Sequence, residues 1–82
     1  NEVETSRASV FPNPFTNQIN ITSDNEDAGF VRLIDINGRE INRTIMSKSI
    51  SIDNLDSLTH GIYFLQIFDV NDEIMEVQKV IK

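Results

Sequence analysis

The chain has 82 residues, which gives room for one hydrophobic core, so we expect a single domain. Its 39% of hydrophobic and 24% of charged residues exclude an intrinsically disordered segment, and no apolar run approaches the roughly 20 residues of a membrane span, so no direct membrane insertion is expected. Thirteen acidic and seven basic side chains give a net charge of −6, which argues against nucleic acid as a partner, and the lack of cysteine excludes disulfides and thiolate chemistry.

The first nine residues are polar and acidic, and no apolar periodicity runs through them. They predict a linker over residues 1–9, followed by a domain over residues 10–82. Because the chain begins at Asn1 and not at a methionine, we expect it to be part of a longer protein with another domain upstream.

A short edge strand is expected at Val10 and Phe11, after which the chain turns at Pro12, Asn13 and Pro14. Two prolines two residues apart fix the backbone φ angle and push the residue before each of them toward extended geometry. This rigid exit from the strand can serve either packing or presentation to a partner.

Six further strands are predicted by apolar residues that recur at every second position or in short unbroken runs. They cover residues 18–22, 30–36, 40–46, 48–53, 62–69 and 73–81. Asn37-Gly38, between the second and third of these, is typical of a type I′ hairpin turn. Seven short strands indicate an antiparallel sandwich or a small barrel, and we favour the sandwich: an all-β, seven-stranded antiparallel immunoglobulin-like β-sandwich.

One reason for favouring the sandwich is the segment from Leu58 to Tyr63. A tyrosine that begins a strand just after a corner between two sheets is a feature of immunoglobulin-like domains. We expect Gly61 to supply the sharp bend and Leu58 to point inward. Tyr63, Leu65 and Ile67 would form the core face of the strand that follows.

The residues that usually carry catalysis are almost missing. His60 is the only histidine, and without a cysteine or a Gly-x-Ser-x-Gly elbow no nucleophile and base can be paired, so we expect no enzyme activity. The three glycines are too dispersed for a phosphate-binding loop. The acidic loop over residues 24–29 has Ala28 where a calcium loop needs an oxygen ligand, so we expect neither a metal nor another cofactor.

Carbohydrate binding needs exposed aromatic platforms. The sequence has no tryptophan, one tyrosine and five phenylalanines, and the phenylalanines stand mostly at positions expected in the core. A carbohydrate-binding module is therefore kept as an alternative only, and a glycan array would decide it.

Four blocks of residues occur in an order and spacing that a known family shares. They are Val10-Phe11-Pro12-Asn13-Pro14, the segment 31–41, the segment 58–67 and the last four residues, 79–82. Singly each block is a weak signal, but together they resemble the type A C-terminal sorting domain of the type IX, or Por, secretion system. The resemblance covers almost the whole chain.

The resemblance implies a seven-stranded immunoglobulin-like sandwich, in agreement with the strands predicted from the residues alone. It also implies a secretion signal at the C-terminal end of a larger exported protein, the cargo. In the family, the cargo enters the periplasm, an outer-membrane translocon recognises the domain, and a sortase-like protease removes it. The cargo then lies at the cell surface or in the medium.

By analogy with the family, the protease would cut in the polar linker, where small side chains and an extended backbone suit a protease. The residues expected there are Thr5, Ser6, Arg7, Ala8 and Ser9.

For recognition by the translocon we expect the last strand and the tail, because an exposed terminal strand can pair edge to edge with a receptor. The residues are Val77, Lys79, Val80, Ile81 and Lys82. The two lysines would add charge complementarity, or alternatively they keep a solvated edge from aggregating.

The remaining motif residues are expected to act through the fold. Asn37 and Gly38 would hold a hairpin, and Leu58, Gly61 and Tyr63 would hold a corner, so their substitution would impair sorting by unfolding the signal. A passive immunoglobulin-like or fibronectin-like spacer would have the same strands. The position of the domain in the gene would distinguish a sorting signal from a spacer, because a sorting signal ends the open reading frame.

Overall fold

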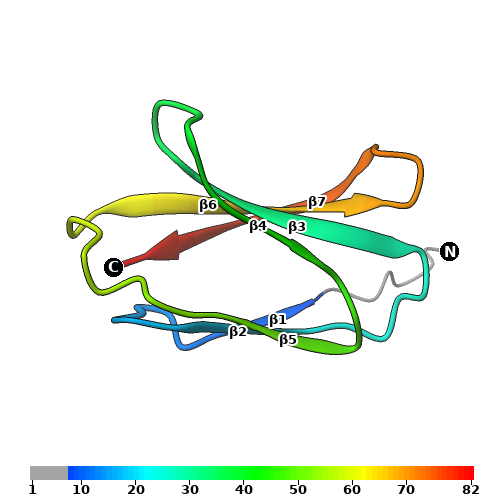
Figure 1. The fold of residues 1–82 in the computed structure, drawn as a ribbon, viewed down its shortest axis with the longest axis horizontal. Helices are drawn as coiled ribbons and strands as arrows, with labels where there is room; N and C mark the ends of the chain where they lie inside the picture. Colours follow the sequence, from blue (N-terminus) through cyan, green and yellow to red (C-terminus); the bar gives the residue numbers. More distant parts are fainter. Residues whose placement is uncertain (1–7) are drawn as a thin grey trace, which may run out of the picture.

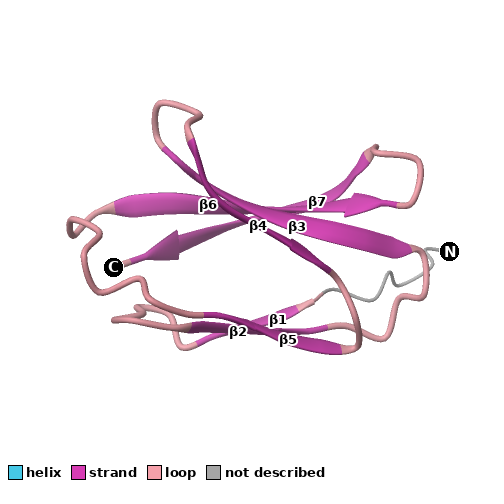
Figure 2. Cartoon of the chain, viewed as in Figure 1, coloured by secondary structure: helices cyan, strands magenta, loops and turns pink. Residues whose placement is uncertain are grey.

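Seven strands and no helix make up residues 8–82, the part of the chain that the computed structural model describes (Figure 1, Figure 2). The strands are β1 (Ser9–Phe11), β2 (Ile19–Thr22), β3 (Ala28–Asp35), β4 (Glu40–Ile45), β5 (Ser49–Ile52), β6 (Ile62–Asp69) and β7 (Ile74–Ile81). Each lies where the sequence predicts a strand. Within these residues no helix is long and apolar enough to cross a membrane.

Two antiparallel sheets face each other in two layers (Figure 1). The smaller sheet has the strand order β1-β2-β5 and the larger one β4-β3-β6-β7, so the chain crosses between the sheets after β2, after β4 and after β5. The predicted all-β sandwich is therefore confirmed.

Alternate side chains of the strands fill the space between the sheets. Ile19 and Ile21 of β2 point inward from the smaller sheet, and Tyr63, Leu65 and Ile67 of β6 are buried on the opposite side, as predicted. Burying one large aliphatic side chain stabilises a fold by roughly 1.5–3 kcal/mol. A slip by one residue would turn such a set of side chains to solvent, so the alternation fixes the register of both strands.

The β3–β4 hairpin does not contain the predicted type I′ turn. That turn needs a positive φ at both central residues, whereas Gly38 has φ 82° and Asn37 is not in the positive region. The amide of Gly38 donates to the carbonyl of Asp35 (3.0 Å), and the amide of Asp35 donates to the carbonyl of Arg39 (3.0 Å). The loop is thus a type I turn followed by a left-handed glycine. The Asp35 carboxylate favours this longer loop, because it accepts the amides of Asn37 and Arg39 at 2.9 Å each.

The predicted tyrosine corner is present at the start of β6. The hydroxyl of Tyr63 donates to the carbonyl of Thr59 at 2.6 Å, and Leu58 packs against the core from the same connection. Gly61 has φ 156°, a value that residues with a side chain rarely adopt. Its amide donates to the carbonyl of Lys82 at 3.2 Å, and its carbonyl accepts from the amide of Lys82 at 2.9 Å. The corner is thereby tied to the end of the chain.

Candidate functional site

The last strand, β7, is one edge of the larger sheet. Its side chains alternate between the two faces of that sheet: Val80 is completely buried in the core, whereas Val77, Lys79 and Ile81 are exposed on the outer face. Of the residues predicted for recognition, Val80 therefore serves the core, and three expose their side chains to solvent.

Part of the backbone edge of β7 already has hydrogen-bond partners within the domain. Since Lys82 exchanges its backbone hydrogen bonds with Gly61, the residue before β6, the N–H and C=O groups of Lys79 and Ile81 point away from the sheet. The amide of Ile81 donates to Asn13 Oδ1 (3.0 Å), Asn13 Nδ2 donates to the carbonyl of Lys79 (3.3 Å), and the amide of Phe15 donates to the carbonyl of Ile81 (2.8 Å). Pairing with a receptor along residues 79–81 would have to displace this clamp.

Asn13, one of the proline-motif residues, is therefore in contact with the predicted recognition strand. Pro12 and Pro14 both follow cis peptide bonds, and they hold Asn13 between them. Of the two roles left open by the sequence, packing and presentation, the contacts of Asn13 support packing against the last strand. Local sequence patterns gave no signal for this contact, because the two segments are 66 to 68 residues apart.

Lys82 has a more specific environment than a surface lysine. Its ammonium group donates to the backbone carbonyls of Leu55 (2.9 Å), Asp56 (2.9 Å) and Leu58 (2.8 Å). Hydrogen bonds from a charged donor are the stronger kind, and these three satisfy carbonyls of the β5–β6 connection. The Lys82 side chain thus holds the chain end to the corner, and Lys79 is the lysine of this strand that extends into solvent.

The chain enters the fold beside the same strand. Ala8 is buried, its amide donates to Glu76 Oε1 (3.2 Å), and its carbonyl accepts from Gln78 Nε2 (2.7 Å). Ser9 is the first residue of β1 and pairs with Thr22 of β2. The folded unit therefore includes Ala8 and Ser9, which precede residue 10.

This boundary bears on the predicted cleavage region. Ala8 and Ser9 are held by tertiary contacts and strand pairing, so a protease could bind them only after β1 had left the sheet. Thr5, Ser6 and Arg7 lie outside the described residues.

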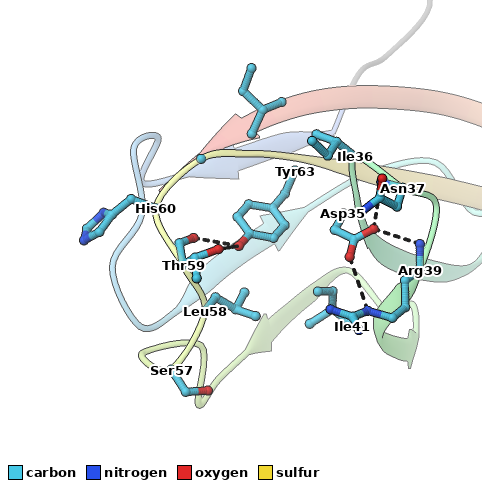
Figure 3. A pocket seen from close by; sticks show the side chains of 12 residues that line it. Asp35, Ile36, Asn37, Arg39, Ile41, Ser57, Leu58, Thr59, His60 and Tyr63 are labelled. Carbon is cyan, nitrogen blue, oxygen red and sulfur yellow. Dashed lines mark hydrogen bonds and ion pairs between the residues drawn. The ribbon is translucent and has the colours of Figure 1, made fainter.

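A shallow groove of about 400 Å³ lies between the β3–β4 turn and the β5–β6 connection (Figure 3). Its polar side chains stabilise turns: hydrogen bonds from the backbone amides of Arg39 and Asn37, together with the nearby Arg39 guanidinium, lower the pKa of the Asp35 carboxyl. His60 is exposed and points away from the groove in Figure 3. Over residues 8–82 there is no group of three or more side chains that could hold a metal ion.

The phenylalanines do not lie where the sequence suggested. Phe15 is buried, whereas Phe30, Phe64 and Phe68 lie on the outer face of the larger sheet and Phe11 is exposed on β1. The expectation that most of them belong to the core is wrong. Strands with apolar residues on both faces do not reveal from sequence which face turns inward.

One protein family model matches residues 9–82, and the family is described as the secretion system C-terminal sorting domain. The match begins at the first residue of β1 and includes every strand of both sheets. A comparison with individual curated proteins gives no match. Because the matched span includes all seven strands, the chain belongs to this family over the whole sandwich and not over a short motif within it.

Proposed function

Because this chain belongs to the family of C-terminal sorting domains of the type IX secretion system, we propose that it carries an upstream cargo protein through the periplasm and across the outer membrane. A sortase-like protease then removes the domain, and the cargo lies at the cell surface or in the medium. The observation that carries this proposal is the family match over all seven strands, residues 9–82.

The outer-membrane translocon would recognise the folded domain through outward side chains of β7. Val77, Lys79 and Ile81 are exposed, whereas the backbone at residues 79–81 is engaged by Asn13 and Phe15. These contacts favour recognition through side chains over edge-to-edge pairing at the end of the strand. Val80 and Lys82 would then contribute by holding the strand in place.

Cleavage would fall within Thr5, Ser6 and Arg7, because hydrogen bonds to Glu76 and Gln78 attach Ala8 to the fold. Protein sequencing of the mature cargo's new C-terminus checks this. A cut at or before the Arg7–Ala8 bond is expected, and a cut beyond Ser9 would show that β1 opens before proteolysis.

The function is tested by fusing residues 1–82 to the C-terminus of a periplasm-directed fluorescent protein in a host with a type IX system. The location of the reporter is compared with a translocon-deficient strain by fractionation. Translocon-dependent appearance at the surface or in the medium, with loss of the domain, is the expected result. Retention in the periplasm of both strains would favour a passive immunoglobulin-like spacer.

A further inference from the structure

A row of apolar side chains crosses the outer face of the larger sheet. The strand register places Ile45 of β4 opposite Phe30 of β3, Phe30 opposite Phe68 of β6, and Phe68 opposite Ile74 of β7. Ile45 is 80% exposed, and Val70, in the turn between β6 and β7, is 69% exposed. We call these five residues the apolar row.

The middle of the apolar row is ordered by its own contacts. The rings of Phe30 and Phe68 stack with centroids 4.5 Å apart and planes 5° from parallel, and the Arg43 guanidinium lies 4.7 Å from the centroid of the Phe30 ring. Ile45 and Val70 stand beside Phe30 around one depression, with Arg43 and Asp72 also among its lining residues. A solvent-facing side of an antiparallel sheet is usually polar, so such a prearranged apolar surface is typical of a binding site.

The next two rows of the same face carry positive charge. Arg43 of β4 lies opposite Arg32 of β3, and both contact the carboxylate of Glu40. Glu40 Oε1 lies 2.8 Å from Arg32 Nε and 3.0 Å from Arg43 Nη2. The hydrogen bond from Arg43 has the largest effect and that from Arg32 the next, and both lower the pKa of the Glu40 carboxyl. Lys79 lies on this face too, opposite Phe64.

Three cations against one carboxylate give these rows a charge of +2, although the whole chain carries −6. On the far side of the apolar row, the β6–β7 turn carries the carboxylates of Asp69, Asp72 and Glu73, and Asp69 keeps its charge while it accepts the amides of Asn71 and Glu73. The face is thus cationic on the side of the apolar row that carries Arg32, Arg43 and Lys79, and acidic on the side of the β6–β7 turn.

From this arrangement we propose that the outer face of the larger sheet docks onto an acidic and apolar protein surface of the export apparatus. Apolar side chains of that partner would cover the apolar row, and its carboxylates would face Arg32, Arg43 and Lys79. The inference rests on the proposed function. It extends the recognition surface from the outward side chains of β7 across all four strands.

The charge pattern also bears on two other occupants, a second copy of this chain and an anionic lipid surface. In a symmetric contact whose two-fold axis crosses the apolar row, the cationic rows of one copy would approach those of the other, which opposes association. With the axis along the row, the cationic rows would meet the acidic turn, and sedimentation velocity tests that arrangement. An anionic lipid surface is extended, so it would attract the three cations but would also face the acidic β6–β7 turn. A protein surface can place its carboxylates opposite the cationic rows alone and leave the acidic turn uncovered.

The test uses the reporter fusion and pairs of substitutions at the two most exposed members of the apolar row. Ile45→Glu with Val70→Glu removes the apolar contact and adds repulsion toward an acidic partner. Ile45→Lys with Val70→Lys removes the same contact and adds attraction. Ile36→Glu is the matched control, because Ile36 is 70% exposed in the β3–β4 turn, at the opposite end of the sheet (Figure 1).

We expect the glutamate pair to lower the exported fraction at least tenfold, the lysine pair to lower it less, and the control to leave it unchanged. The thermal unfolding midpoints of the purified chains should agree with wild type, since these side chains are mostly solvated. Failure of the wild-type fusion to be exported would contradict the proposed function itself. Normal export of the glutamate pair beside an exported wild type would overturn the docking surface alone.

Two measurements on the purified chain distinguish the other occupants. Sedimentation velocity would overturn the proposal if wild type were a dimer and the glutamate pair a monomer, because the occupant would then be a second copy. Flotation with phosphatidylglycerol vesicles would overturn it if wild type bound and the glutamate pair did not. A monomeric wild type that does not bind the vesicles supports an acidic protein partner, if the exported fraction also falls from wild type to the lysine pair to the glutamate pair.

Discussion

The two faces of the larger sheet have the same strands and comparable numbers of apolar side chains, yet only one face is covered. On the inner face, Val31, Leu33 and Leu65 are fully buried against the smaller sheet. On the outer face, Ile45 and Ile74 remain largely exposed at the two ends of the apolar row. Folding accounts for the hydrophobicity of the inner face. The hydrophobicity of the outer face requires another explanation, and a partner supplies one.

The largest effect on stability is expected on the inner face. Leu65→Ala removes a completely buried side chain and should lower the free energy of unfolding by about 2–5 kcal/mol, through lost burial and a residual cavity. Ile45→Ala on the outer face should change it by less than about 0.5 kcal/mol. Urea denaturation of both variants tests this, and equal losses would remove the distinction between the two faces.

The next effect concerns the two lysines of the last strand. Lys82→Met leaves three carbonyls without their ammonium donor, and it should cost about 1–3 kcal/mol of unfolding free energy. Lys79→Met should cost less than about 0.5 kcal/mol, because Lys79 is exposed. If thermal unfolding shows the same loss for both, the carbonyl contacts of Lys82 do not stabilise the corner.

A smaller effect is expected from Tyr63→Phe, which keeps the buried ring and removes the hydroxyl that bonds the carbonyl of Thr59. Loss of one hydrogen bond should lower the free energy of unfolding by about 0.5–1.5 kcal/mol. Export should survive, because the outer face is untouched. A fully stable variant that is not exported would place Tyr63 in recognition and not only in the fold.

The smallest effect is a dependence on pH. The folded state lowers the pKa of the Asp35 and Glu40 carboxyls, so the unfolded chain takes up protons first as the pH falls. Their contribution is therefore complete above the ordinary carboxyl pKa of about 4 and is lost below it. The urea midpoint should fall less steeply between about pH 5 and pH 2.5 in Asp35→Asn and Glu40→Gln than in wild type. Unchanged slopes would mean that the unfolded chain perturbs both groups equally.

Local patterns in the sequence were sufficient for the strands and the corner. The bounds of β6 agree with the prediction residue for residue, because a run rich in β-branched and aromatic residues alternates between the faces and ends at a turn. The Asn37-Gly38 signal located its hairpin, but the Asp35 side chain selects a different turn type.

Contacts between distant segments could not be predicted in this way. The Asn13 clamp on β7 and the Lys82 contacts join residues that are at least 24 positions apart, and no local pattern marks either. Ala8 resembled a linker residue because a small side chain suits both a linker and a tight core position. The apolar outer face of the larger sheet was not predicted either, because β3 is apolar on both faces and its sequence does not show which face turns inward.

The most direct test measures the exported fraction and the free energy of unfolding for the same four fusions: wild type, Leu65→Ala, the Ile45→Glu and Val70→Glu pair, and Ile36→Glu. The inner-face variant should lose export in proportion to its loss of stability, whereas the outer-face pair should lose export at wild-type stability. If the exported fraction followed stability alone in all four, the outer face would have no part in recognition.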